Sequence, residues 1–224
     1  MDLQLREGLF HCCSGARAIF LDSATNRYFA LPPQLERAFQ KIRNKVSLID
    51  HELQFAETLI SCGVLSHAPS SVSVNWPQPI PPPIGDLPRF GIARPTASLI
   101  LRAVYARLWA RGFVNRNGIG GLRRAFDRLS NQGPSLRSEG VDPRLAQLRS
   151  AFEIVDKLSS PRDQCLPRSL AMHRLAKRGG AKTQIILGVR TEPFAAHCWV
   201  EFEQQVVSGD FEQARLFTPI MRIE

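Results

Sequence analysis

Three side chains in the last third of the sequence have the types needed for covalent acyl transfer: Cys165, His197 and Asp210. A cysteine thiolate attacks carbonyl carbons, a histidine moves protons, and an aspartate orients the histidine and supports its charge. Each residue alone is more often structural. The elements predicted around them favour the functional interpretation.

The pattern of prolines and glycines predicts that Cys165 lies at the start of a helix. Pro161 breaks any preceding helix, Pro167 fits only a first helical turn, and Gly179-Gly180 end the helix. The positive end of the helix dipole favours the thiolate, which is the nucleophilic form. His173 lies eight residues after Cys165, or ~12 Å along the axis, and is too distant to act on the sulfur.

Three strands are predicted after this helix. Because side chains alternate along a strand, His197, Trp199 and Glu201 share one face and Cys198 lies on the other. Cys198 is therefore interpreted as a core side chain. The predicted strands are residues 183–189, 194–202 and 206–210.

The choice of acid depends on the hairpin register. If Glu203-Gln204 form a two-residue loop, His197 faces Asp210 directly, with Cβ atoms ~5 Å apart. An aspartate at that distance can bind one imidazole nitrogen. Glu201 and Glu212 are alternatives to Asp210, and a buried histidine with a turn aspartate is the purely structural interpretation.

Composition excludes several classes of protein. The 224 residues are 44% apolar and 22% charged, which is typical of a globular chain. No run approaches the ~18 apolar residues of a membrane span, and the first residues do not resemble a secretion signal, so we expect a cytoplasmic protein. Five cysteines, an odd number, predict reduced thiols. No cofactor is expected, and the glycines at 118–121 lack the lysine of a phosphate-binding loop.

Proline divides the chain into two domains. Eight of the 16 prolines fall between Pro69 and Pro95, which predicts an extended linker over residues 67–95. Trp76 is a candidate for pinning this linker to one domain. The predicted domains are residues 1–66 and 96–224. The second should begin with helices over Thr96–Arg111, Leu122–Ser130 and Pro143–Leu158.

The first domain is predicted to be a small winged-helix-type module of three strands and helices. The strands are Gly8–Cys13, Ala16–Leu21 and Arg27–Leu31, and one helix opens at Pro32-Pro33 while another ends at Gly63. Adjacent cysteines alternate faces on a strand, so no metal site is predicted from this domain's candidate ligands, which are His11, Cys12, Cys13 and Cys62.

The positive charge belongs to one segment. Residues 89–137 hold ten arginines and one acid, and the net charge of the whole chain is +9. Arginines at helical spacing most often form a solvated face. The alternative is a docking face for a partner or an acidic peptide. Charge-reversing substitutions in this segment that left both assembly with the partner and turnover of the substrate unchanged would exclude that alternative. The first domain is neutral, which argues against nucleic-acid binding by that module.

The first domain resembles PqqD-like precursor-recognition elements. The resemblance lies in AIFLDSATNRYFALPP (residues 18–33) and LISCGVL (residues 59–65). It implies that a leader peptide adds as a strand beside the third strand and packs on the last helix. The residues that match those surfaces are Arg27, Tyr28, Phe29, Ala30, Leu31, Leu53, Ala56 and Ile60.

The second domain resembles lasso-peptide biosynthesis B proteins, through CLPRSL (residues 165–170), PFAAHCWVE (193–201), VVSGD (206–210) and LFTPI (216–220). The resemblance implies an α+β chain in which a transglutaminase-like or papain-like cysteine peptidase domain follows the recognition module. It implies a cysteine endopeptidase that cuts a lasso precursor peptide at the leader–core junction, and a separate ATP-dependent cyclase as partner. Amine transfer of the transglutaminase type and non-catalytic nucleic-acid binding are the alternatives.

Overall fold

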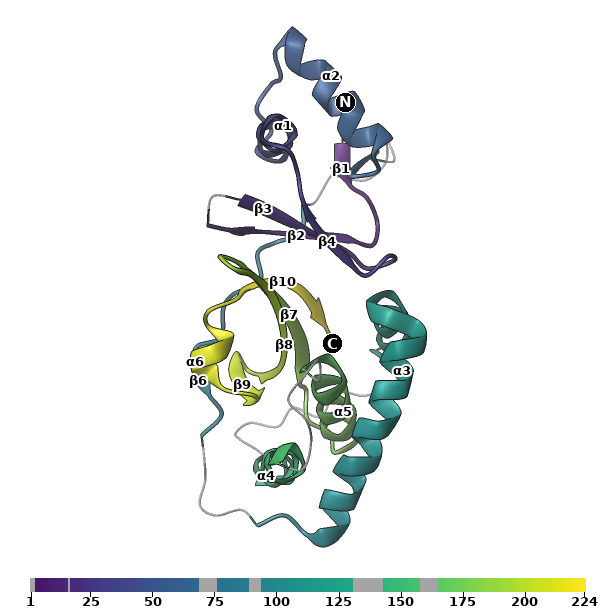
Figure 1. Cartoon of the computed structure of the whole chain (residues 1–224), viewed down its shortest axis with the longest axis vertical. Coiled ribbons are helices and arrows are strands. Elements are labelled where there is room, and N and C mark those ends of the chain that lie inside the picture. Colours follow the sequence, from purple (N-terminus) through teal and green to yellow (C-terminus); the bar gives the residue numbers. More distant parts are fainter. Residues whose placement is uncertain (1–2, 16, 69–75, 89–93, 131–142, 158–164) are drawn as a thin grey trace. The chain divides into compact units, whose positions relative to one another are not determined.

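A computed structural model describes residues 3–15, 17–68, 76–88, 94–130, 143–157 and 165–224. The chain divides into two compact units, Met1–Pro79 and Ile80–Glu224, each with its own sheet and helices (Figure 1). Parts of the predicted linker and of the arginine-rich segment, and also Pro161, lie outside the described residues.

A three-stranded antiparallel sheet forms one layer of the first unit. Its strands, in spatial order, are β2 (Leu9–Ser14), β3 (Arg17–Asp22) and β4 (Arg27–Ala30). The central strand β3 is apolar and buried from Ala18 to Leu21, as expected for a strand with neighbours on both sides. The three strands predicted from the sequence are confirmed.

Two helices complete the core of this unit. α1 (Pro33–Arg43) begins with a proline at its first position, where the missing N–H costs nothing, and α2 (Asp50–Ser61) follows. Phe20, Phe39 and Leu59 are fully buried between the sheet and the helices. A second, two-stranded sheet, which the sequence did not predict, pairs β1 (Leu3–Leu5) with β5 (Leu65–His67).

Trp76 is pinned to the first unit, as the sequence suggested. Its ring lies 5.6 Å from Phe39 and 6.3 Å from His11, both edge to face. Burial, with a smaller contribution from the charge of Arg43, lowers the pKa of His11 to about 4. His11 is therefore a neutral side chain packed among aromatic rings, and the described residues contain no group of three or more potential metal ligands.

A five-stranded sheet forms the centre of the second unit. All neighbouring strands are antiparallel except β6 and β9, which are parallel. The strand of this sheet that comes first along the chain, β6, lies inside the range predicted as linker. The next residue, Leu87, is buried and donates its N–H to the carbonyl of Val206. The order is β10 (Thr218–Ile223), β7 (Gln184–Thr191), β8 (Phe194–Phe202), β9 (Gln205–Ser208), β6 (Gly85–Asp86).

Helices pack around α5 (Cys165–Arg178), which contacts β8 as well as α3 (Ala97–Ser130) and α4 (Pro143–Lys157). Figure 1 shows α5 between the sheet and α3. Leu170 and Ala171 of α5 are fully buried. This packing fixes the axis of the helix that carries the candidate nucleophile.

The sequence predicted two helices over Thr96–Arg111 and Leu122–Ser130, and α3 does consist of two helical segments. They meet at Gly118, whose φ of 59° and ψ of −164° are non-helical, and both extend closer to this residue than predicted. Glycine tolerates this conformation because it has no Cβ. The break is therefore a local kink rather than a loop.

Candidate active site

Cys165 is the first residue of α5, as its sequence context predicted. The side chain is half-buried, and its sulfur is not part of a disulfide bond. The backbone N–H groups of the first helical turn lie at this position, and the helix dipole favours negative charge there. A thiol in this setting suits nucleophilic attack, and the same N–H groups suit a developing oxyanion.

Ser169 ties the beginning of α5 to the sheet. Its hydroxyl donates to the carbonyl oxygen of Cys198 at 3.1 Å, and its Oγ lies 3.4 Å from Oγ of Ser208. Both serines are buried. Ser169 lies one helical turn after Cys165. Its bond to Cys198 therefore fixes the first turn of α5, which carries Cys165, against β8 near the end of β9.

His197 lies on β8, opposite Gly188 of β7. Its ring stacks on Trp199 at 5.9 Å and contacts Phe217 at 5.2 Å. Burial lowers the pKa of His197, and the positive charge of Arg168 on the first turn of α5 lowers it further. The imidazole is therefore held in its neutral form, which can accept a proton, and the effect of Arg168 puts it within electrostatic range of the first turn of α5.

The neighbouring thiol and the second histidine have structural roles. Cys198 is buried, and burial together with the nearby thiol of Cys165 raises the pKa of Cys198 well above its ordinary value. It therefore stays protonated. His173 is buried in α5, its Nδ1 lies 2.9 Å from Oγ1 of Thr183, and burial, with a smaller effect of Lys177, lowers its pKa to about 4.

The predicted cross-strand pairing of His197 with Asp210 was wrong. The two-residue loop at Glu203-Gln204 is present, but the register shifts beyond Glu201, so that Val200 pairs with Ser208. β9 ends at Ser208. The left-handed Gly209, with φ of 104°, turns the chain out of the sheet before the predicted partner position is reached.

Asp210 instead caps the short helix α6 (Phe211–Ala214). Its carboxylate accepts the N–H of Glu212 at 3.0 Å. The side chain is exposed, on the loop that follows β9. Any role for Asp210 in supporting His197 must therefore come from this loop rather than from strand pairing.

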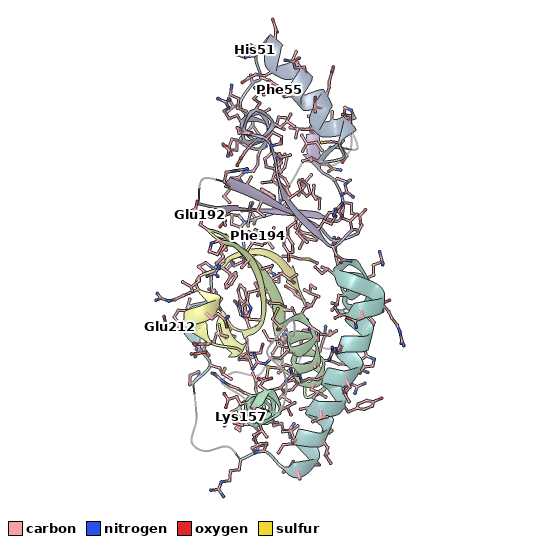
Figure 2. The ribbon with its side chains drawn as sticks, viewed as in Figure 1. His51, Phe55, Lys157, Glu192, Phe194 and Glu212 are labelled. Atoms are coloured by element: carbon pink, nitrogen blue, oxygen red, sulfur yellow. The ribbon has the colours of Figure 1, made fainter. Side chains whose placement is uncertain are left out.

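The two alternative acids are occupied elsewhere. Glu201 is buried and accepts the indole N–H of Trp199 at 2.6 Å, and burial raises its pKa. It lies four residues from His197 on the same strand, a distance of ~13 Å. Glu212, labelled on α6 in Figure 2, pairs with Arg215 at 2.8 Å and is mostly exposed.

Arg168 is a site residue that the sequence reasoning missed. Its guanidinium pairs with Asp156 of α4 at 2.6 Å, and Asp156 also pairs with Arg107 of α3. A Cβ added to Gly209 would lie 3.7 Å from the same guanidinium. Arg168 therefore joins the nucleophile's helix to α4 and approaches the loop that carries Asp210. The sequence signal that could have identified Arg168 is its position three residues after Cys165, within the same helical turn.

An open sheet edge lies in the first unit, where the sequence placed leader binding. β4 pairs with β3 on one side and has no second neighbour among the strands of the described residues. Phe29 on β4 is 36% exposed and Leu53 on α2 is 50% exposed. Figure 2 labels His51 and Phe55, which lie on the same helix as Leu53.

Two of the predicted leader contacts need correction. Leu31 and Ala56 are buried, at 4% and 7% exposure, because both pack into the core of the first unit. They cannot contact a peptide on the surface. Two apolar residues that the sequence analysis did not name, Val46 and Ile49, are instead exposed. Both lie in the connection between α1 and α2.

The fold and site identify the class of protein. A family model described as the transglutaminase-like superfamily matches residues 106–222, just over half of the chain. The match includes α5, β7, β8, β9 and all but the last residue of β10, and with them Cys165, His197 and Asp210. The chain therefore belongs to the transglutaminase-like superfamily.

A curated relative is similar over a shorter stretch. The chain is 34% identical over 59 residues to the microcin J25-processing protein McjB of Escherichia coli. The similarity covers 26% of this chain and 28% of McjB, so the chain spans little more than a quarter of that relative. No solved structure gives a significant match. Among the described residues, no helix has the length and apolarity needed to cross a membrane.

Proposed function

We propose that this protein is a cysteine endopeptidase that removes the leader from a lasso-peptide precursor. The observation that carries the proposal is the position of Cys165 at the start of α5, on a turn bonded through Ser169 to β8 beside His197. Membership of the transglutaminase-like superfamily and the similarity to a microcin-processing protein support it.

In the first half of the reaction, His197 accepts the thiol proton of Cys165 and the sulfur bonds to the carbonyl carbon at the leader–core junction. Backbone N–H groups at the start of α5 stabilise the oxyanion. The tetrahedral intermediate then loses the core amine, to which the imidazolium of His197 returns the proton. The leader is left as a thioester on Cys165.

In the second half, water replaces the amine. His197 takes one proton from the water, the hydroxyl bonds to the thioester carbon, and the carbon–sulfur bond breaks as the imidazolium returns the proton to the departing sulfur. The products are the leader carboxylic acid and the regenerated Cys165 thiol. Asp210, from the loop after β9, supports the positive charge of the imidazolium in both halves.

The first unit is proposed to capture the leader as a PqqD-like recognition element. The leader pairs with the open edge of β4 and places apolar side chains against Phe29, Leu53 and the half-buried Ile60. Tethering the leader raises the effective concentration of the scissile bond at Cys165. The freed core amine then passes to a separate ATP-dependent cyclase, the second proposed partner.

Transfer to an amine is the second candidate function. The superfamily name itself points to transglutaminase chemistry, in which an amine rather than water takes the acyl group from the thioester. The two reactions share every step up to the thioester and differ only in the acceptor.

Mass spectrometry of the full chain incubated with the precursor peptide, with and without an added primary amine, tests the proposal. Free leader and free core are the expected products, with no turnover by Cys165→Ala and retained turnover by the matched variant Cys198→Ser. A leader–amine adduct would favour transfer. The incubations are repeated with the cyclase added. A precursor that stays intact in every mixture, with or without the cyclase, would contradict the proposal.

A further inference from the structure

Three large apolar side chains on α3 face solvent. Leu101, Tyr105 and Leu108 are 70%, 71% and 66% exposed. Their spacing of four and three residues puts them in one stripe along the helix. Apolar residues exposed singly are ordinary, but a stripe of three on one helix is typical of a docking surface.

A groove runs beside this stripe, between α3 and α5. It consists of two adjoining hollows of about 350 and 260 Å³, which share Arg102, Leu175 and Arg178 in their walls. Leu101 and Tyr105 line the smaller hollow, which extends the groove onto the exposed stripe. We call this surface the α3–α5 groove. Further apolar atoms come from Leu99, Leu145, Leu148 and Ala106.

The walls of the groove are strongly basic. They contain the guanidinium groups of Arg102, Arg144, Arg174 and Arg178, and none of the residues that line either hollow is acidic. Partial burial lowers the pKa of Arg174, and the like charge of Arg178 lowers it further, which indicates that these two cations lie close together. Arg174 also stacks 3.6 Å above the ring of Trp109, which holds it in place.

We propose that the α3–α5 groove binds an acidic amphipathic helix of a partner protein. An apolar floor with cationic walls complements a helix that has leucine-like side chains on one face and carboxylates beside them. The stretch from Ser98 to Leu108 is ~15 Å long, which matches about three turns of a bound helix. Nucleic acid would use the arginines but would leave the exposed aliphatic side chains Leu101 and Leu108 without partners.

The groove lies away from the candidate active site. Arg178 ends α5, whereas Cys165 begins it, so the two lie ~20 Å apart along the helix axis. A partner in the groove therefore leaves access to Cys165 open. The proposal does not depend on the peptidase mechanism.

The probe for the experiment is a fluorescein-labelled peptide of about 18 residues with leucines along one helical stripe and glutamates elsewhere. Its fluorescence anisotropy is measured against the full chain. We expect saturable binding that weakens with added salt. Arg102→Glu/Arg178→Glu and Leu101→Ser/Tyr105→Ser should each weaken it by about tenfold or more.

Controls carry single substitutions of the same kind outside the groove: Arg37→Glu on α1, and Leu216→Ser at an exposed leucine. Both should bind the peptide like the unchanged chain, and circular dichroism confirms that every variant is folded. Equal binding of a scrambled peptide of the same composition would overturn the proposal. Unaltered affinity in both groove variants would also overturn it, as would a preference for a DNA duplex that the groove variants abolish.

Discussion

Replacing Ser169 with alanine removes the hydrogen bond that ties the turn of Cys165 to β8. Ser169 is fully buried, and its hydroxyl is 3.1 Å from the carbonyl oxygen of Cys198. A buried acceptor that loses its donor costs ~1–3 kcal/mol of folding free energy. For a unit of this size, the melting temperature should fall by roughly 3 to 10 °C.

The same change should slow the proposed reaction. A looser first turn misplaces the sulfur, and misplacement of this kind lowers the single-turnover cleavage rate by about tenfold or more. Cleavage is followed with the precursor peptide well below the melting temperature, so that stability and rate are read separately.

Ser208→Ala is the matched control for this experiment. Ser208 is buried beside Ser169, 3.4 Å between Oγ atoms, but it does not make the bond to Cys198. Its loss should cost less than about 1 kcal/mol. Equal effects of the two substitutions on stability and rate, or no effect of Ser169→Ala, would refute the positioning role of the hydrogen bond.

Three further predictions follow from charge and exposure. Arg168→Gln removes a positive neighbour, so the pKa of His197 should rise and the acidic limb of the pH–rate profile should move to higher pH; an unmoved limb would contradict this. The pKa of His173 is about 4 in the folded chain against an ordinary 6.5, so the folded state binds fewer protons and the free energy of unfolding should fall by up to ~3 kcal/mol as pH drops from 6.5 towards 4. In urea titrations, the free energy of unfolding of His173→Gln should depend less on pH than that of the unchanged chain. An identical pH dependence for the two proteins would contradict this prediction. Phe29→Glu should weaken leader binding about tenfold in anisotropy titrations while Leu216→Ser leaves it unchanged; equal losses would exclude the β4 edge.

Local sequence signals predicted the parts of the molecule that are determined locally. Prolines and glycines around Cys165 define the helix it begins, because they restrict the backbone directly. The hairpin loop at Glu203-Gln204 was also predicted, although both residues adopt positive φ, which is uncommon without glycine. Alternation along residues 194–202 correctly separated the faces of His197 and Cys198.

Features set by distant contacts were not predictable in this way. The register shift between Val200 and Glu201 has no local signature, and it moves Asp210 away from the position expected for an unshifted ladder. The pairing of Arg168 with Asp156 joins helices that only the tertiary fold brings together. The β1–β5 pairing likewise joins residues about sixty positions apart.

The central claim, that His197 serves Cys165, can be tested without any substrate. Iodoacetamide is added to the full chain near neutral pH, and alkylation of each cysteine is followed by mass spectrometry, with the exposed Cys13 and Cys62 as internal references. We predict that Cys165 reacts much faster than both references and that His197→Gln removes most of this advantage. A rate at Cys165 that equals the references, or that His197→Gln leaves unchanged, would contradict the claim.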